Sequence, residues 1–332
     1  MSWRFFVAAA ALAVLGPCQA GAETSEVRIA RQPSLGHLPL MIMEDRKLLE
    51  KKAAARGIEG LKVSYATLAG GAAMNDALLS DAIQFAAGGV PPLVLLWSRT
   101  QSSSNAVKGV SAMNSMPLLL NTSNPEVKSI KDFTARDKIA LPAVKVSIQA
   151  INLQMAAEKE LGPDRREELD KYTVTLSHTD GYAALLAKRE ITAHFTAAPI
   201  QELELRQPGV RTVLNSFDVM GPSTFNVVWA TSRFVEQNPK IYEAFVEALD
   251  EAIAAINADK AAAAKDYVRL AKDGSDVALI EQILNDPQVT FTTTPQNVGK
   301  YAEFMSRVGT IKTAPGSWKD MFFTNLHGKS GG

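Results

Sequence analysis

The chain has 332 residues, of which 46% are hydrophobic and 21% are charged. It can therefore form a large apolar core and is long enough for two domains. Its 35 basic and 35 acidic side chains balance, so no broad positive field marks it as a nucleic-acid-binding protein, and we expect no nucleic acid as a partner.

Residues 1–22 have the pattern of a secretory signal peptide. Arg4 supplies a positive charge, an apolar run follows over 5–15, and small residues at 20–22 form a cleavage site. The apolar run is too short for a stable membrane span. Cys18 is the only cysteine, so the mature chain is expected to have no disulfide and no thiolate site. Lipid attachment at Cys18 stays open as an alternative. We therefore predict export to the periplasm.

The N-terminal part of the mature chain alternates short apolar runs with helical patterns. Strands are predicted over 26–31, 61–65 and 83–87. Helices are predicted over 38–49, over 70–79 and from Val90 onward. This β-α-β-α order is typical of a parallel sheet that is covered by helices.

A strand, a loop and a helix follow one another in the middle of the chain. A short apolar strand over 139–141 ends at Pro142, which cannot donate to a ladder. Ser147 has the side chain of an N-cap, Ile148 begins a helical apolar spacing, and Gly162 ends the helix. The free N–H groups and the dipole at this helix N-terminus suit an anion, although most strand–turn–helix units bind nothing.

The remaining segments continue the α/β pattern and end in helices. Further strands are predicted over 107–113, 118–121, 172–176, 192–196, 211–214 and 224–231. Further helices are predicted over 182–187, 234–256, 260–272 and 277–284. The segment 318–323 has an amphipathic pattern.

Two short segments, 114–117 and 221–223, join one strand to the next without a helix. We interpret them as crossovers between two lobes, with lobe I formed by 26–113 plus 223–327 and lobe II by 114–222. Each lobe should contain a mainly parallel sheet flanked by helices. The ligand crevice of such open α/β sheets lies at the carboxyl ends of the strands, here between the lobes.

Signatures of enzymes are absent from the sequence. It contains no G-x-G-x-x-G, no Walker P-loop and no G-x-S-x-G elbow. The four histidines are scattered, and His178 is interpreted as part of a surface turn. The charge runs 158–160 and 165–168 are interpreted as solvated helix faces. We therefore predict no catalytic residues, no metal site and no cofactor.

Loops that follow predicted strands should line the cleft, at 32–37, 87–91, 143–149 and 196–199. They are small, polar or rich in glycine, which suits the binding of a polar head group rather than chemistry on it. The predicted ligand-binding residues are Gln32, His37, Gly88, Gly89, Asn114, Ser147, Ile148, Gln149, Ala198 and Asn226.

Apolar residues surround these loops, namely Leu38, Met41, Val90, Met113, Ile148 and Phe195. We therefore expect a small organic anion, such as a sulfonate or carboxylate with a hydrocarbon part, rather than a bare inorganic ion. Arg31 and Lys145 could pair with this anion or face solvent, and the sequence leaves both alternatives open.

Three segments, taken together and in order, carry a family resemblance. They are D-A-I-Q-F-A-A-G-G-V-P at 81–91, S-I-K-D-F-T-A-R-D-K-I-A-L-P at 129–142, and Y-A-A-L-L-A-K-R-E-I-T-A-H-F-T-A-A-P at 182–199. Over residues 26–325 the chain resembles bacterial ABC-transporter solute-binding proteins of the nitrate/sulfonate/taurine (NMT1/THI5-like) class. Lys188 stands where that class usually has a glycine.

The resemblance implies a type II-like periplasmic-binding-protein fold and a receptor that closes its lobes on a ligand. An inner-membrane ABC permease would be its partner, and we expect a monomer. An enzyme of pyrimidine metabolism from the NMT1/THI5-like branch is an alternative, although the mature chain lacks the cysteine-rich motif that this chemistry uses. The ligand-binding subunit of a sensor is a further alternative.

Overall fold

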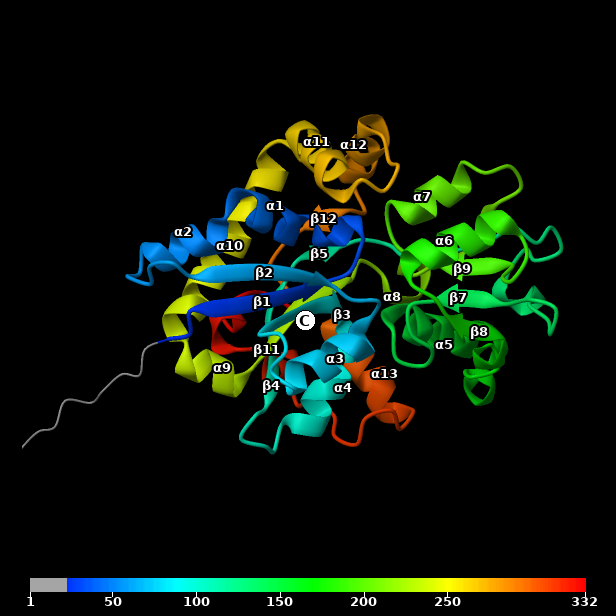
Figure 1. Ribbon diagram of the computed structural model, residues 1–332. Coiled ribbons are helices and arrows are strands. Elements are labelled where there is room, and N and C mark those ends of the chain that lie inside the picture. Colours follow the sequence, from blue (N-terminus) through cyan, green and yellow to red (C-terminus); the bar gives the residue numbers. More distant parts are fainter. Residues whose placement is uncertain (1–22) are drawn as a thin grey trace, which may run out of the picture.

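The computed structural model describes residues 23–332, so the predicted signal peptide lies outside the described residues. It contains two five-stranded sheets, placed side by side in Figure 1. The first sheet has the order β2-β1-β3-β11-β4, with β1 at Glu26–Arg31, β2 at Lys62–Thr67, β3 at Phe85–Gly89, β4 at Val107–Ala112 and β11 at Asn226–Thr231. The second has the order β10-β6-β9-β7-β8, with β6 at Leu119–Thr122, β7 at Ile139–Leu141, β8 at Thr173–Thr175, β9 at Ala193–Phe195 and β10 at Arg211–Asn215.

Both sheets share one pattern of strand directions. In the first sheet, β11 is antiparallel to β3 and to β4, while β1 is parallel to β2 and to β3. In the second, β6 is antiparallel to β9 and to β10, while β7 is parallel to β8 and to β9. One strand in each sheet therefore runs against the other four, which confirms the prediction of mainly parallel sheets. The reversed strand is in each case the one that the chain enters from the other sheet.

Helices flank both sheets, as predicted. Around the first sheet and its edge lie α1 (Leu38–Arg46), α2 (Leu48–Ala54), α3 (Gly71–Leu79), α4 (Val90–Thr100), α9 (Ser232–Gln237), α10 (Pro239–Ala258), α11 (Lys260–Ala271), α12 (Val277–Asn285) and α13 (Val298–Arg307). Around the second lie α5 (Ile148–Leu161), α6 (His178–Ala187), α7 (Ile200–Leu205) and α8 (Phe217–Met220). Short 3-10 helices are η1 (Leu35–His37), η2 (Ile130–Asp132), η3 (Pro163–Arg165), η4 (Asp170–Tyr172), η5 (Trp318–Met321) and η6 (Thr324–Leu326). No helix within 23–332 has the length and apolar character that a bilayer crossing requires.

Two predicted helices are each divided into two. The helix predicted over 38–49 is broken at Lys47, which adopts a left-handed conformation with φ of 51°. The helix predicted over 234–256 is broken at Asn238, because Pro239 disfavours helical geometry in the residue before it and lacks an N–H group. Lys188 also has a positive φ, 52°, at the end of α6, so this lysine adopts the conformation for which glycine is usually selected.

The two crossovers lie beside each other. The sequence analysis missed β5 (Asn114–Ser115) and its antiparallel partner β12 (Thr290–Phe291), because two-residue strands leave no periodic pattern. Ser115 also forms a bridge with Thr224, and the Phe225 N–H donates to the Asn114 carbonyl at 3.1 Å. The crossovers therefore pair with one another. The lobe boundaries themselves, 26–113 plus 223–327 and 114–222, remain a prediction.

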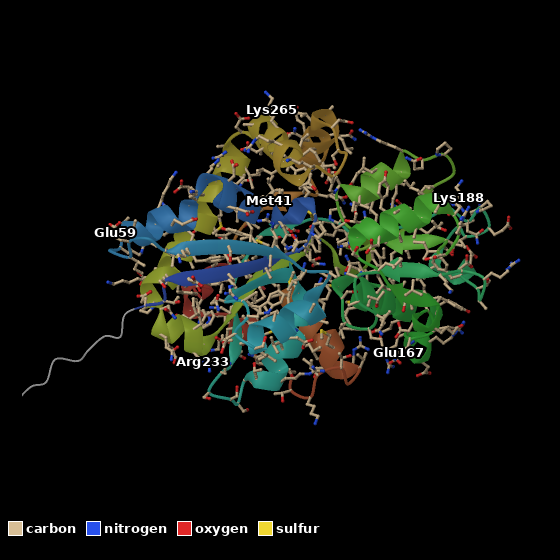
Figure 2. All side chains as sticks on the ribbon, in the orientation of Figure 1. Met41, Glu59, Glu167, Lys188, Arg233 and Lys265 are labelled. Carbon is tan, nitrogen blue, oxygen red and sulfur yellow. The ribbon has the colours of Figure 1, made fainter. Side chains whose placement is uncertain are left out.

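The main hydrophobic core extends through both sheets, and charged side chains lie outside it. Every residue of β3 and β11 is buried, and Trp229, Phe85 and Phe245 are among the largest buried side chains. Figure 2 shows the charged residues that it labels, such as Lys188, on the periphery. The run 165–168 is on the surface as well, where the Arg165 guanidinium donates to Glu168 Oε1 at 2.8 Å.

Candidate functional site

Loops from the two sheets meet in a contact zone that we call the seam, formed by 32–37, 87–91, 143–149 and 196–199. The Leu35 N–H donates to the Ala198 carbonyl at 2.8 Å. A Cβ atom on Gly89 would lie 2.8 Å from Ile148 Cγ2, so the absence of a side chain there permits close approach. The seam therefore joins the strand ends of both sheets directly. Eight of the ten predicted ligand-binding residues lie in it, Asn114 lies in a crossover, and Asn226 is the first residue of β11.

His37 is held firmly on the first-sheet side of the seam. It is fully buried, and its Nε2 atom lies 3.1 Å from the Ala87 carbonyl while Nδ1 lies 3.0 Å from the Ser34 hydroxyl. A carbonyl only accepts, so Nε2 carries the proton and Nδ1 accepts from Ser34. Burial lowers the pKa of His37 to about 3, against the opposing effect of the Ala87 hydrogen bond, and the nearby Arg31 charge lowers it further. His37 is thus neutral at pH 7 and has no ring nitrogen left for a ligand.

Gln32 and Gly88 lie close together on the same side. Gln32 Nε2 donates to the Ala69 carbonyl at 3.1 Å. A Cβ atom on Gly88 would lie 3.4 Å from Gln32 Oε1 and 3.2 Å from Trp229 Cη2. Trp229 is fully buried, and its Nε1 atom has no hydrogen-bond partner within the described residues. The pattern of the sequence did not identify this tryptophan, because it occupies an ordinary core position of β11.

Asn114 and Asn226 link the crossovers to the seam. Asn114 Nδ2 donates to the Gly36 carbonyl at 2.6 Å, and Asn114 Oδ1 accepts from the Asn226 N–H at 3.3 Å. Both asparagines are fully buried. Asn226 Nδ2 has no partner among residues 23–332, so this amide carries a buried donor that the protein itself leaves unused.

The second-sheet side contributes the N-terminus of α5. Ser147 is its N-cap, with an extended backbone and a hydroxyl that accepts from the Ala150 N–H at 3.2 Å, which confirms the predicted cap. Gln149 in the first turn is 2% exposed, and its Nε2 atom has no partner in the described part of the chain. A 14-residue helix therefore has its positive end at the seam, and its first turn carries a buried amide donor without a partner in the described chain.

Neither basic residue whose orientation the sequence left open offers a free charge to the seam. The Arg31 guanidinium pairs with Glu44 at 2.6 Å and lies 5.1 Å from the centroid of the Tyr65 ring. Lys145 is exposed, at a backbone φ of 65°. Beside the seam, the buried donors without a partner in the described chain are the amides of Gln149 and Asn226, the Trp229 indole and Nη1 of Arg31.

His178 corrects the sequence analysis, because it is not in a surface turn. It is 2% exposed, at the first position of α6, and its Nδ1 atom lies 2.7 Å from Thr196 Oγ1. Burial lowers its pKa to about 3, and the charges of His194 and His37 act in the same direction. Ser177 accepts from the Asp180 N–H at 3.1 Å, so the S-x-x-D pattern could have predicted a capped helix here.

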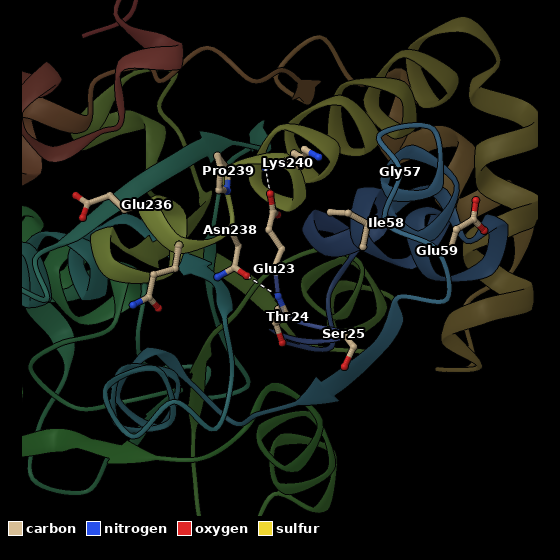
Figure 3. A pocket seen from close by; sticks show the side chains of 11 residues that line it. Glu23, Thr24, Ser25, Gly57, Ile58, Glu59, Glu236, Asn238, Pro239 and Lys240 are labelled. Carbon is tan, nitrogen blue, oxygen red and sulfur yellow. Dashed lines mark hydrogen bonds between the residues drawn. The ribbon is translucent and has the colours of Figure 1, made fainter. Parts of the chain in front are cut away.

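One surface hollow lies away from the seam. It has a volume of about 990 Å³ and is lined by 23–25, 57–59 and 236–240, and Figure 3 shows it from close by. There the Glu23 carboxylate accepts from the N–H groups of Lys240 and Ile241, at 2.9 and 2.8 Å, at the start of α10. None of the predicted ligand-binding residues lines this hollow. Its hydrogen bonds hold the N-terminal end of the described chain against the start of α10.

Solved structures with a similar fold include periplasmic binding proteins. The alkanesulfonate-binding protein SsuA from Xanthomonas axonopodis pv. citri, bound to MOPS, has a TM-score of 0.69 at 17% identity, over 89% of this chain and 96% of that one. The periplasmic aliphatic sulphonate binding protein SsuA from Escherichia coli has a TM-score of 0.64 at 18% identity, over 93% and 100%. The periplasmic nitrate-binding protein NrtA from Synechocystis PCC 6803 has a TM-score of 0.66 at 15% identity, over 90% and 84%.

These similarities establish the predicted periplasmic-binding-protein fold. Among curated protein sequences, none matches this chain significantly. Residues 20–272, the larger part of the chain, match the NMT1-like family. The chain therefore belongs to the NMT1-like family.

Proposed function

We propose that this protein is a periplasmic solute-binding protein, which closes its lobes on a small organic anion and delivers it to an inner-membrane ABC permease. The observation that carries the proposal is the unpaired, buried amide of Gln149 at the N-terminus of α5. A buried donor without a partner costs about 1–3 kcal/mol. An oxygen of the ligand would satisfy it, and the helix dipole would favour a negatively charged one.

The apolar surroundings support an organic ligand. Val90, Met113 and Phe195 are fully buried beside the seam, and Met41 is 8% exposed. These side chains suit a hydrocarbon part, while Gln149 and Asn226 offer donors to the head group. The sulfonate that the Xanthomonas protein holds has both parts, which agrees with this division of roles.

The proposed function also requires export of the chain to the periplasm and closure of the two lobes around the ligand. The predicted signal peptide at 1–22 supports a periplasmic location, and the direct contacts across the seam require the lobes to separate before a ligand can enter. We propose that the mature protein works as a monomer, with the exposed surfaces of both lobes available to the permease. A sulfonate or carboxylate would remain bound until the lobes reopen.

Thermal unfolding with a panel of alkanesulfonates, carboxylates, nitrate and sulfate tests this function. A ligand at about 100 times its Kd should stabilise the wild type by roughly 2.7 kcal/mol. Gln149→Ala should weaken binding by about 1–3 kcal/mol, because it removes a direct donor to a charged partner. Gln288→Ala, a change at an exposed glutamine outside the seam, is the matched control. Full affinity in the Gln149 variant would place the head group elsewhere.

A further inference from the structure

A basic hollow lies at the end of the second sheet that is opposite to the seam. Its volume is about 420 Å³, which is within the usual size of small-molecule pockets. The loops before β7 and β9 line it with four basic side chains, Arg136, Lys138, Lys188 and Arg189. Because β7 and β9 are parallel neighbours, their N-terminal ends meet at one edge of the sheet, while their C-terminal ends reach the seam. Figure 2 shows Lys188 at this outer edge.

The four basic side chains of the hollow have no acidic partner. Elsewhere in the protein such groups are neutralised by ion pairs, as where Lys131 lies 2.7 Å from Glu160. None of the four forms an ion pair within residues 23–332. Among the described residues that line the hollow, Glu190 is the only acidic one. An excess of positive charge therefore surrounds this space.

Hydrogen bonds join the two loops that carry these cations. The Lys138 carbonyl accepts from the Thr192 N–H at 3.0 Å, and Thr192 Oγ1 donates to Asp137 Oδ1 at 2.9 Å. Asp137 is 2% exposed, and its other oxygen accepts from the Thr134 N–H at 3.0 Å. Neutral donors inside the protein therefore solvate this carboxylate, and the same bonds hold the backbone around the hollow in place.

We propose that this hollow binds a compact polyanion that carries phosphate groups. Arginine and lysine bind phosphate oxygens through charge-assisted hydrogen bonds, and an anion in the hollow would be flanked by cations from both loops. In the described chain, no aromatic residue lines the hollow, and its one apolar side chain, Ile191, is 3% exposed. A hydrocarbon part or a nucleobase therefore has no surface to pack on here, in contrast to the apolar surroundings of the seam.

Calorimetric titration of the mature protein with sodium pyrophosphate, without any organic anion, tests the site. The wild type should bind one pyrophosphate, with an affinity that falls as salt is added, because salt screens exposed charges. Lys188→Gly removes one cation and should weaken binding roughly tenfold, as expected for the loss of one hydrogen bond to a charged group. Since Lys188 has a φ of 52°, glycine suits this backbone, and the variant should melt no lower than the wild type.

Lys272→Gly is the matched control. Lys272 is also exposed, and it ends α11 with a φ of 51°, so this variant changes charge and backbone freedom in the same way outside the hollow. It should bind pyrophosphate as the wild type does. Arg136→Gln, on the other loop, should weaken binding by a factor similar to that of Lys188→Gly. The proposal is overturned if the wild type does not bind pyrophosphate, if either hollow variant binds as the wild type, or if Lys272→Gly weakens binding as much as Lys188→Gly.

Co-sedimentation with vesicles distinguishes two sources of the phosphate groups. The vesicles contain phosphatidylcholine with or without cardiolipin, whose headgroup carries two phosphates. Binding to the cardiolipin vesicles that Lys188→Gly reduces and Lys272→Gly does not would assign the hollow to a lipid headgroup. Pyrophosphate binding without vesicle binding would assign it to a soluble anion. These results are independent of the organic-anion function, because no residue of the hollow lies in the seam.

Discussion

The two sides of the seam use the same kinds of residue in different ways. On the first-sheet side, His37 has both ring nitrogens bonded, and Gln32 and Asn114 each donate to a backbone carbonyl. On the second-sheet side, His178 bonds through Nδ1 to Thr196, and the amide of Gln149 has no donor bond within the described residues.

This difference indicates that the polar groups of the seam have two different roles. Gln32, His37 and Asn114 are occupied in holding η1, β3 and the crossovers together, so they position the backbone. Asn226 Nδ2 on the first-sheet side and Gln149 Nε2 on the second-sheet side stay unpaired within the described residues, and we propose that these two amides meet the ligand. Charge on the ligand would be met by the α5 dipole and by neutral donors, with Nη1 of Arg31 as a further unpaired donor beside the seam. Three experiments test the roles assigned to these groups.

Acidification should destabilise the protein through both histidines, and this is the largest of the three expected changes in stability. Each has a folded pKa of about 3 and an ordinary value of 6.5, so the unfolded state binds more protons between these values. The stability that each contributes is present above pH 6.5 and is lost as the pH falls, by roughly 1.4 kcal/mol per pH unit. From pH 6.5 to 4.5 each histidine should therefore cost roughly 2.7 kcal/mol. Glu202, whose pKa is raised to about 7, acts in the opposite direction over this window.

Urea unfolding of His178→Gln and the wild type at both pH values isolates this effect. The variant should lose less stability than the wild type between pH 6.5 and 4.5, by roughly 2.7 kcal/mol. His37→Gln should be less stable than His178→Gln at pH 7.5, because two hydrogen bonds depend on the His37 ring. Equal losses in both variants would contradict the positioning role of His37.

Adding a side-chain atom to the tightly packed seam should lower stability by an intermediate amount. Gly89→Ala places a Cβ atom 2.8 Å from Ile148 Cγ2, which should destabilise the closed protein by about 1–3 kcal/mol and favour open lobes. Small-angle scattering should show a larger radius of gyration. Gly299→Ala is the control, because nothing lies within 4 Å of its added Cβ.

Combining Gly89→Ala with Ile148→Gly should restore part of the compaction, since the second change removes both clashing atoms, Ile148 Cγ2 at 2.8 Å and Ile148 Cβ at 2.9 Å. If Gly89→Ala alone scatters like the wild type with and without ligand, Gly89 and Ile148 do not limit closure.

Removing the N-cap of α5 should cause the smallest loss of stability. Ser147→Ala removes the acceptor of the Ala150 N–H and should cost roughly 1 kcal/mol of stability. Ser177→Ala removes the equivalent cap of α6 and should cost about the same. Isothermal titration should then show weaker ligand binding for the Ser147 variant alone. If Ser177→Ala lowers affinity more, the head group lies at α6 rather than at α5.

Local signals in the sequence were sufficient for much of the fold. The strand at 139–141 and the cap at Ser147 were predicted at the residues where they occur, because both depend on neighbours within a few residues. The alternation of strands and helices and the order of the family segments also indicated the fold class. The breaks predicted at Pro142 and Gly162 were confirmed, whereas the break before Pro239 was missed although its steric rule is local.

Contacts between distant segments decided the rest. Arg31 could not be assigned a partner from its neighbours, because Glu44 reaches it only after α1 packs beside β1 and β2. His178 looked like a surface residue, since its burial depends on Thr196 at the end of another strand. β5 exists only because β12, far along the chain, pairs with it. Most strands, helices and caps could be predicted because they depend on neighbouring residues. The pairing of polar groups could not be predicted, because it depends on residues that the fold brings together from distant parts of the chain.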